Sequence, residues 1–212
     1  MFLLSITDIK VLVELLTRKK RTPFFAVKPE SEKSSFSLFV LAVITVDFIE
    51  WDVTSAAHVM KRSNLGEVFV IGGAEIPRGT RRTIRLPIAP LYTLAAMAMP
   101  VHVVRGRRDG PRLFVSAAIH GDEILGVEII RRLLGLRLLK HLRGTLIAVP
   151  VVNVYGYTAR SRCLPDRRDL NRSFPGSPTG SMASRLAHTF MTEVVANATH
   201  GIDLHTGAID RT

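Results

Sequence analysis

The sequence predicts an α/β fold, a three-layer sandwich in which helices flank a mixed, mostly parallel sheet. Short apolar runs that are typical of buried strands alternate with amphipathic helical segments, and glycine or proline marks the ends of many of these runs. The chain has 212 residues, of which 47% are hydrophobic, and this is enough to fill the core of one substantial domain.

The predicted fold occupies residues 65–212, because the composition of the chain changes at the start of this range. Lysine is common before it, whereas Lys140 is the single lysine within it. The preceding part contains a charged stretch, TRKKRTPFFAVKPESEKSS, that is typical of a loop or linker. This stretch separates an expected helix near residues 7–17 from an expected strand near residues 36–48. We interpret residues 1–64 as an N-terminal extension without recognisable chemistry.

The strands of the domain are predicted from short apolar runs. EVFVIGG and RRTIRLPIA are bounded by Gly and Pro, and VHVVRG and RLFVSAAI flank an Asp-Gly pair that predicts a hairpin-like pair of strands. GTLIAVPVV predicts a further strand over residues 144–152, and GIDLHTG predicts a last short one.

Two helices complete the pattern. The first is expected over residues 122–134, and the second over residues 181–198, where Leu186, Phe190 and Val194 form a ridge at a spacing of four.

The formal net charge of +11 raises the question of a nucleic-acid or membrane partner. The basic residues are spread in ones and twos, without the interleaved aromatic side chains that a single-strand-binding groove uses. We therefore expect a protein without a nucleic-acid partner.

A cytoplasmic location is expected from the apolar segments and the cysteine content. The most apolar stretch, FSLFVLAVITV, has eleven residues before Asp47, short of the roughly 20 that span a bilayer. The N-terminus lacks the basic region of a signal peptide. A single cysteine, Cys163, excludes an intramolecular disulfide and suits a reducing compartment. We expect no membrane partner.

The apolar run VSAAI is followed by His120, Gly121, Asp122 and Glu123, at the point where a strand gives way to a helix. Functional groups of α/β sheets collect at the carboxyl ends of strands. A spacing of three brings His120 and Glu123 to the same side, and both side chains are zinc ligands. Such a pair also occurs as surface side chains or as a helix cap.

A catalytic zinc site needs a third protein ligand and an open position for water. His205 in DLHTG and His200 in THGID are the two candidates. We prefer His205, because it stands at the far end of its predicted strand and should reach the same edge of the sheet as His120. Asp203 is then a candidate hydrogen-bond partner for a ligating histidine.

The stretch RSRCLPDRRDLNRSFPG, residues 160–176, has two interpretations. It could be a basic loop in which Asp and Asn make local turns. It could also bind a substrate, because a guanidinium next to an amide suits a carboxylate, and a second arginine could stabilise charge on a reacting carbonyl.

HGDE, RDLNRSFPG and DLHTG, in this order, resemble the motifs of the succinylglutamate desuccinylase/aspartoacylase branch of the zinc carboxypeptidase superfamily. The resemblance covers roughly residues 65–212 and implies a zinc-carboxypeptidase-like fold. It also implies one Zn²⁺ ion, held by three ligands: His120, Glu123 and His205.

The same resemblance assigns roles in the basic loop. It implies that Asn171 and Arg172 bind the carboxylate of a small-molecule substrate, and that Arg162 is the catalytic arginine on the oxyanion side.

The implied activity is that of a zinc-dependent hydrolase, a deacylase or carboxypeptidase-like enzyme that cleaves the amide bond of an N-acyl amino acid or related small molecule. Zinc would lower the pKa of its bound water from about 15.7 toward about 7. In the family the general base is a glutamate well beyond the third ligand, whereas this sequence ends at Thr212. We therefore expect residues 65–212 to form the N-terminal part of a catalytic domain, inactive as it stands.

Two other classes of function stay open. A basic non-catalytic protein that binds nucleic acid or another anionic ligand would contain no metal and would bind with a steep salt dependence. An enzyme with Cys163 as nucleophile would need a histidine beside the thiol, and the sequence contains no matching signature.

Overall fold

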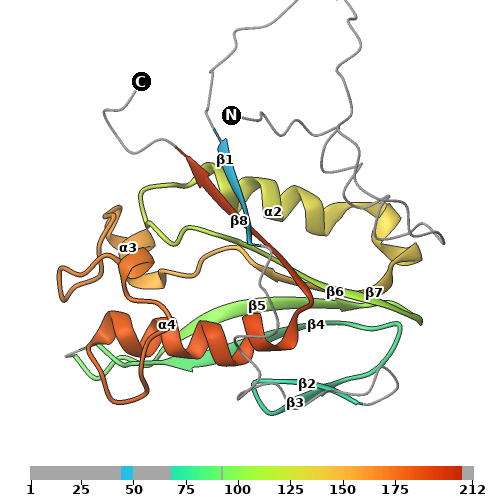
Figure 1. Ribbon diagram of the computed structural model, residues 1–212, viewed down its shortest axis with the longest axis horizontal. Coiled ribbons are helices and arrows are strands. Elements are labelled where there is room, and N and C mark those ends of the chain that lie inside the picture. The colour runs from blue at the N-terminus through green and yellow to red at the C-terminus, as the bar shows by residue number, and fades with distance from the viewer. Residues whose placement is uncertain (1–43, 50–67, 92, 207–212) are drawn as a thin grey trace, which may run out of the picture.

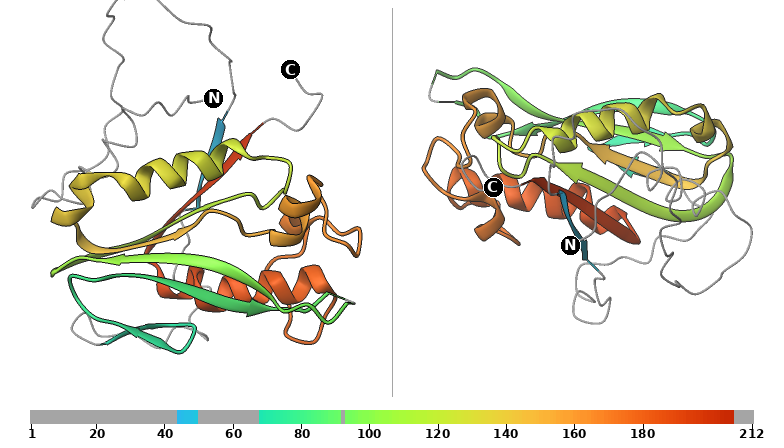
Figure 2. Two further views of the ribbon diagram at one scale, coloured as in Figure 1. Left: turned by 180° about the vertical axis from the view of Figure 1, so that it is seen from behind. Right: turned by 90° about the horizontal axis from the view of Figure 1, so that it is seen from above.

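A six-stranded mixed sheet forms the middle layer of the fold, and helices cover both of its faces (Figures 1 and 2). The computed structural model describes residues 44–49, 68–91 and 93–206. The strand order in the sheet is β1-β8-β6-β7-β5-β4. The strands are β1 (Ile44–Ile49), β4 (Arg81–Ile88), β5 (Met97–Arg105), β6 (Arg108–Ala117), β7 (Arg143–Val149) and β8 (His200–Thr206).

Parallel pairing is confined to the three central strands. β6 pairs in parallel with β7 on one side and with β8 on the other, whereas β1, β5 and β4 pair antiparallel with their neighbours. The predicted α/β fold with a mixed sheet is confirmed, although fewer pairs are parallel than we expected. A short connection joins β4 to β5, and only antiparallel neighbours can be joined so closely.

The hairpin predicted for β5 and β6 is wrong, because β7 lies between them. Ile147 of β7 is opposite Val103 of β5 on one side and opposite Phe114 of β6 on the other. The Asp109-Gly110 pair lies inside β6 and not at the turn. β7 is buried at six of its seven residues, so the centre of the sheet, covered on both faces, is the position that removes most of its apolar surface from water.

The two faces of the sheet have separate cores. On one face, α2 (Leu125–Gly135) packs Ile130 and Leu133 against β6, β7 and β8. The other face is covered by α3 (Val154–Ala159) and α4 (Met182–Glu193), where Phe190 meets Phe114 edge to face at a ring-centroid distance of 5.8 Å. None of the helices in the described ranges is long and apolar enough to cross a bilayer.

Both predicted helices are present but shorter than expected. α2 starts three residues later than predicted, because residues 120–124 form a turn. Ile124 is the N-cap residue of this helix, and no side chain caps it. The second helix ends at Glu193 and is followed by a 3₁₀ turn, Val195–Asn197.

A small two-stranded sheet lies beside α4. β2 (Phe69–Ile71) and β3 (Ala74–Ile76) form a hairpin across Gly72 and Gly73, whose positive φ angles of 55° and 73° suit such a two-residue turn. The backbone N–H of Gly72 donates to Glu193 at 2.8 Å, which ties the hairpin to the end of α4.

Two predictions for the N-terminal part fall outside the described residues. The helix near residues 7–17 and most of the strand near residues 36–48 are not described, although β1 occupies the end of the latter. The boundary at residues 64 and 65 also lies there and stays a prediction.

Ile130→Ala should lower the free energy of unfolding by about 2–4 kcal/mol, because Ile130 is fully buried between α2 and the sheet. Ile124→Ala makes the same change at a side chain that is 40% exposed, and it should cost less than about 1 kcal/mol. Urea denaturation of the two variants measures both losses. Equal losses would contradict the described packing of α2.

Candidate metal centre

The carboxyl ends of β6 and β8 lie side by side at the point where the strand order reverses. From β6 the chain passes through α2 to β7 on one side of β6, and later returns through α4 to β8 on the other side. In open α/β sheets, the crevice at such a reversal is where ligands bind. His120 follows the end of β6, and His205 lies near the end of β8.

The turn after β6 is held against α3 by its backbone. The N–H of Gly121 donates to the carbonyl of Ser161 at 3.1 Å. A Cβ atom at Gly121 would lie 1.9 Å from the backbone of Gly156, so only glycine fits this position. The N–H of Glu123 donates to the carbonyl of His120 at 3.2 Å, which closes the turn and leaves both side chains on one side.

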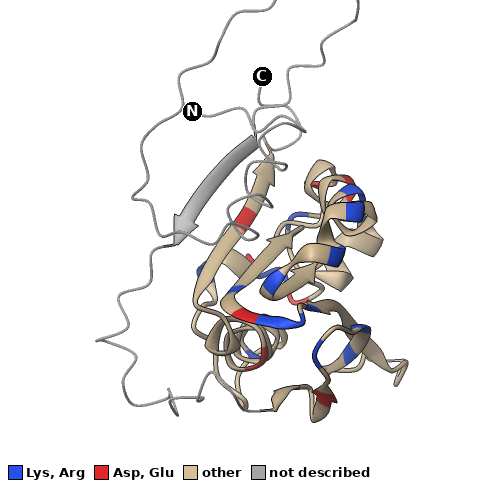
Figure 3. Ribbon diagram, turned by 90° about the vertical axis from the view of Figure 1, so that its right-hand side faces the viewer, with Lys and Arg blue, Asp and Glu red and all other residues tan. Residues whose placement is uncertain are grey.

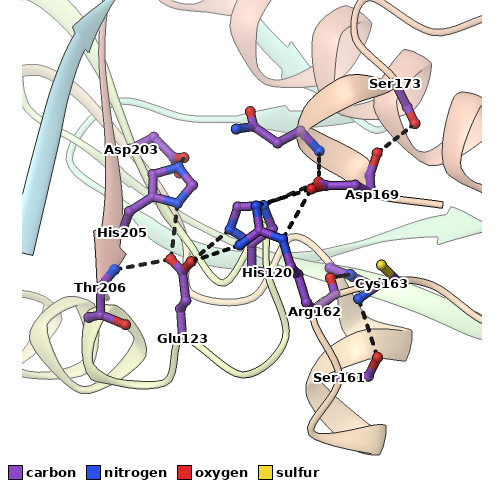
Figure 4. Close-up of polar contacts among 12 residues, drawn as sticks. His120, Glu123, Ser161, Arg162, Cys163, Asp169, Ser173, Asp203, His205 and Thr206 are labelled. Carbon is purple, nitrogen blue, oxygen red and sulfur yellow. Dashed lines mark hydrogen bonds and ion pairs between the residues drawn. The ribbon is translucent and has the colours of Figure 1, made fainter. Parts of the chain in front are cut away.

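Three side chains converge where these strands end (Figure 4). Nδ1 of His120 lies 2.7 Å from Oε1 of Glu123, and Nδ1 of His205 lies 3.0 Å from Oε2 of the same carboxylate. The two imidazole centroids are 5.2 Å apart, and one potential ligand atom from each of the three residues lies within 4.8 Å of the others. His120 and Glu123 are each only 3% exposed.

Each histidine has a second carboxylate behind it. Nε2 of His120 lies 3.2 Å from Oδ1 of Asp169, and Nε2 of His205 lies 2.6 Å from Oδ2 of Asp203. Carboxylates in this position fix the orientation of an imidazole and keep its other nitrogen available to a metal. The buried hydroxyl of Ser116 donates to Oδ1 of Asp203 at 2.7 Å and holds that carboxylate in turn.

One of these two partners was expected from the sequence and the other was missed. Asp203 was a candidate from its place two residues before His205. Asp169 belongs to the basic loop, whose Asp and Asn residues were interpreted as making local turns, and it does accept the N–H of Asn171 at 2.9 Å. Its contact with His120 spans 49 positions, and no local spacing in the sequence reveals it.

The charges at the centre support one another. Burial alone would raise the pKa of Glu123, but hydrogen bonds from His120, His205 and the N–H of Thr206 lower it to about 2. Burial alone would lower the pKa of His205, but its contacts with Asp203 and Glu123 raise it to about 10. A divalent ion that binds His205 through Nδ1 would therefore replace a proton.

The three donors fit a zinc ion. Two imidazole nitrogens and one carboxylate are the ligand types and the number that catalytic zinc sites use, and the fourth position stays available to water. The arrangement is therefore that of a candidate metal centre.

Arg162 lies beside this cluster. Its guanidinium is held by Oδ2 of Asp169 at 3.1 Å, and Nη1 lies 3.8 Å from Oε1 of Glu123 (Figure 4). The side chain is 42% exposed, so it is open to an incoming ligand.

Asn171 and Arg172 belong to a short 3₁₀ helix next to Asp169. Asp169 caps the short 3₁₀ helix Leu170–Arg172, and Leu170 is fully buried beneath it. Both residues are exposed. The loop predicted from its basic sequence is thus brought to the metal cluster through Asp169.

Two other candidates, and one acid of the turn after β6, are arranged differently. His200 is exposed at the amino end of β8, the opposite end from His205, and its Nδ1 lies 2.8 Å from the hydroxyl of Thr199. Cys163 is a half-buried free thiol, and no histidine in the described residues hydrogen-bonds its sulfur. Asp122 has one buried carboxylate oxygen, Oδ1, without a hydrogen-bond partner among the described residues.

Comparison with known proteins agrees with the motifs. Residues 109–212 match the family model of the succinylglutamate desuccinylase/aspartoacylase catalytic domain. This part of the chain belongs to that family. The converging side chains and the basic loop all lie inside the matched range.

The relatives of this family segment include a curated enzyme and solved structures. N-alpha-acetyl-L-2,4-diaminobutyric acid deacetylase of Halomonas elongata is 36% identical over 126 residues, which are 58% of this chain and 36% of that protein. A succinylglutamate desuccinylase/aspartoacylase of Rhodobacter sphaeroides is 28% identical, with a TM-score of 0.54 over 58% of this chain and 38% of that one.

The product-bound ectoine utilization protein EutE (DoeB) of Ruegeria pomeroyi is 30% identical, with a TM-score of 0.52 over 58% of this chain and 39% of that one. The chain therefore spans well under half the length of each of these relatives.

Asp203→Asn should weaken zinc binding by roughly 10- to 100-fold, because His205 loses the carboxylate that orients it. Competition with a chromophoric chelator measures this affinity. Asp109→Asn makes the same change at an exposed position at the far end of β6, and it should leave the affinity within about twofold. Equal zinc affinity in the two variants would contradict the role of Asp203.

Proposed function

We propose that this chain carries the zinc-binding and substrate-carboxylate-binding part of an amidohydrolase that removes the acyl group from an N-acyl amino acid. The observation that carries the proposal is the orientation of the two histidines. Both turn Nδ1 toward Glu123, and both keep Nε2 on an outer carboxylate. The relative whose name describes a deacetylase of an N-acetylated diamino acid supports the substrate class.

His120, Glu123 and His205 would hold one zinc ion. When bound, zinc polarises the scissile carbonyl and lowers the pKa of its bound water, which makes a nucleophile at neutral pH. Asp169 and Asp203 keep the two imidazoles aimed at the centre, and the near-complete burial of Glu123 excludes bulk water from that side.

Arg162 acts on the acyl carbonyl of the substrate. Its guanidinium lies next to Glu123 and is held by Asp169, so it reaches the centre without a large change of conformation. A donor fixed in this position stabilises negative charge as it develops on the carbonyl oxygen, which is where such groups contribute most.

Asn171 and Arg172 bind the carboxylate of the amino acid. A planar guanidinium can hold a carboxylate by two parallel hydrogen bonds, and the amide of Asn171 adds another donor. Both residues are exposed on the short 3₁₀ helix that Asp169 caps, close to the metal cluster but outside it. The amide bond to be cleaved would then lie between these residues and the zinc ion.

The general base lies outside the described residues in this proposal. Among the described residues, the carboxylates at the centre are Glu123, Asp169 and Asp203, and each is already held by a histidine. None of the three is therefore available to take a proton from water. Metal binding and substrate binding are accordingly the properties to test on this chain, separately from turnover.

His205→Ala should abolish stoichiometric zinc binding in the full chain, because one of three ligands is lost. His200→Ala is the matched control, since it removes a histidine from the other end of the same strand and should leave one zinc ion per chain. Metal analysis after dialysis against a weak chelator measures the zinc content of both variants. Equal zinc content in the two variants would overturn the ligand assignment.

Arg172→Ala should weaken the binding of an N-acetyl amino acid to the zinc-loaded chain by about tenfold, which corresponds to the loss of a charge-assisted contact. Arg168→Ala removes an exposed arginine from the same loop and should change the affinity by less than about threefold. Isothermal titration calorimetry measures the affinity of each variant for the N-acetyl amino acid. The zinc content of both variants should stay unchanged. A larger loss of affinity in Arg168→Ala than in Arg172→Ala would contradict the assignment of Arg172 to the substrate site.

A further inference from the structure

Ser116 is a fully buried polar residue near the carboxyl end of β6. Side chains alternate between the faces of a strand, so Ser116 shares a face with Phe114, which belongs to the apolar core beneath α3 and α4. The register sets Ser116 opposite Val149 of β7 on one side and opposite Asp203 of β8 on the other. A hydroxyl in such a position is costly to bury unless it is hydrogen-bonded, so its contacts indicate its role.

The hydroxyl of Ser116 has one proton to donate, and the geometry directs it to Asp203. Oγ of Ser116 lies 2.7 Å from Oδ1 of Asp203 and 3.5 Å from the carbonyl oxygen of Ile202. The first distance is typical of a strong hydrogen bond to a carboxylate, whereas the second is too long for one. Asp203 therefore accepts from Ser116 on Oδ1, while its Oδ2 lies 2.6 Å from Nε2 of His205.

The two carboxylates behind the histidines are held differently. Asp169 belongs to a loop, its side chain is 15% exposed, and Arg162 holds its Oδ2 at 3.1 Å. Lys and Arg occur on several elements of the described chain (Figure 3), yet the described side-chain partners of Asp203 are His205 and Ser116. The terminal torsion of an aspartate has broad preferences, so the imidazole alone would fix the plane of this carboxylate less firmly.

We propose that Ser116 is a positioning residue of the metal centre, which acts on His205 through Asp203. A carboxylate held at both oxygens presents Oδ2 to Nε2 of His205, so this nitrogen carries the proton and Nδ1 is directed toward Glu123 (Figure 4). Without the hydroxyl, Asp203 would have more rotational freedom and the imidazole would be oriented less firmly. The proposal rests on the proposed zinc site, and it extends that site to a residue that contacts no metal ligand directly.

The test is a double-mutant cycle on the full chain, with zinc affinity measured by competition with a chromophoric chelator. Ser116→Ala should weaken zinc binding by about five- to tenfold, which corresponds to the loss of one hydrogen bond. In a chain that already carries Asp203→Ala, the same change should alter the affinity by less than about twofold, because the residue through which Ser116 acts is gone. Equal losses of affinity in the two backgrounds would overturn the proposal.

Ser181→Ala is the matched control, because it removes a serine hydroxyl that stabilises the fold away from the metal centre. Oγ of Ser181 accepts the N–H of Ser184 at 3.2 Å and caps α4. Its loss should lower the Tm of the metal-free chain by about 2–4 °C and leave the zinc affinity within about twofold. A loss of zinc affinity in Ser181→Ala as large as that in Ser116→Ala would overturn the proposal, since reduced stability alone would then explain both.

The same measurements separate the role of Ser116 from the zinc site on which it rests. Zinc binding that is abolished in His205→Ala but unchanged in Ser116→Ala would overturn the role of Ser116 and leave the zinc site intact. Absence of zinc binding by the unaltered chain would overturn both.

Discussion

The parallel pairing of β6 with β8 is the constraint on which the candidate metal centre depends. The register sets Ala117 of β6 opposite Leu204 of β8. The turn that follows β6 therefore lies beside the end of β8. His120 and His205 are 85 positions apart in sequence, yet their rings are 5.2 Å apart for this reason. Side chains alternate between the two faces of a strand, so a register slip of one residue would turn His205 away from Glu123.

Burial of this polar cluster is tolerated because every charge in it has a partner. An isolated carboxylate would be costly to bury, but Glu123 accepts from two imidazoles and from the N–H of Thr206. The carboxylates of Asp169 and Asp203 contact the Nε2 atoms of His120 and His205, on the side of each ring away from Glu123. This layered arrangement orients the site before any metal arrives, and a divalent ion at its centre would take over the role of the proton on His205.

Local features of the chain were predictable from sequence, and non-local ones were not. The positions of β7, β8 and both main helices follow from apolar periodicity, and the HGDE turn and the DLHTG strand each identified residues that the fold brings together. The strand order was missed, because the Asp109-Gly110 pair is a local turn signal, whereas the insertion of β7 between β5 and β6 is decided by burial in the whole sheet. The reach of Asp169 to His120 is likewise a tertiary contact.

The charges near the carboxyl end of β6 show why the net charge of +11 is a poor guide to function. At the carboxyl end of the strand, carboxylates surround two histidines, and Arg162 is tied to Asp169. Arginine therefore supports a buried acidic cluster at this end of the strand, although the chain as a whole is basic. Local balance between arginine and carboxylate, and not their total, decides which ligand this end can bind.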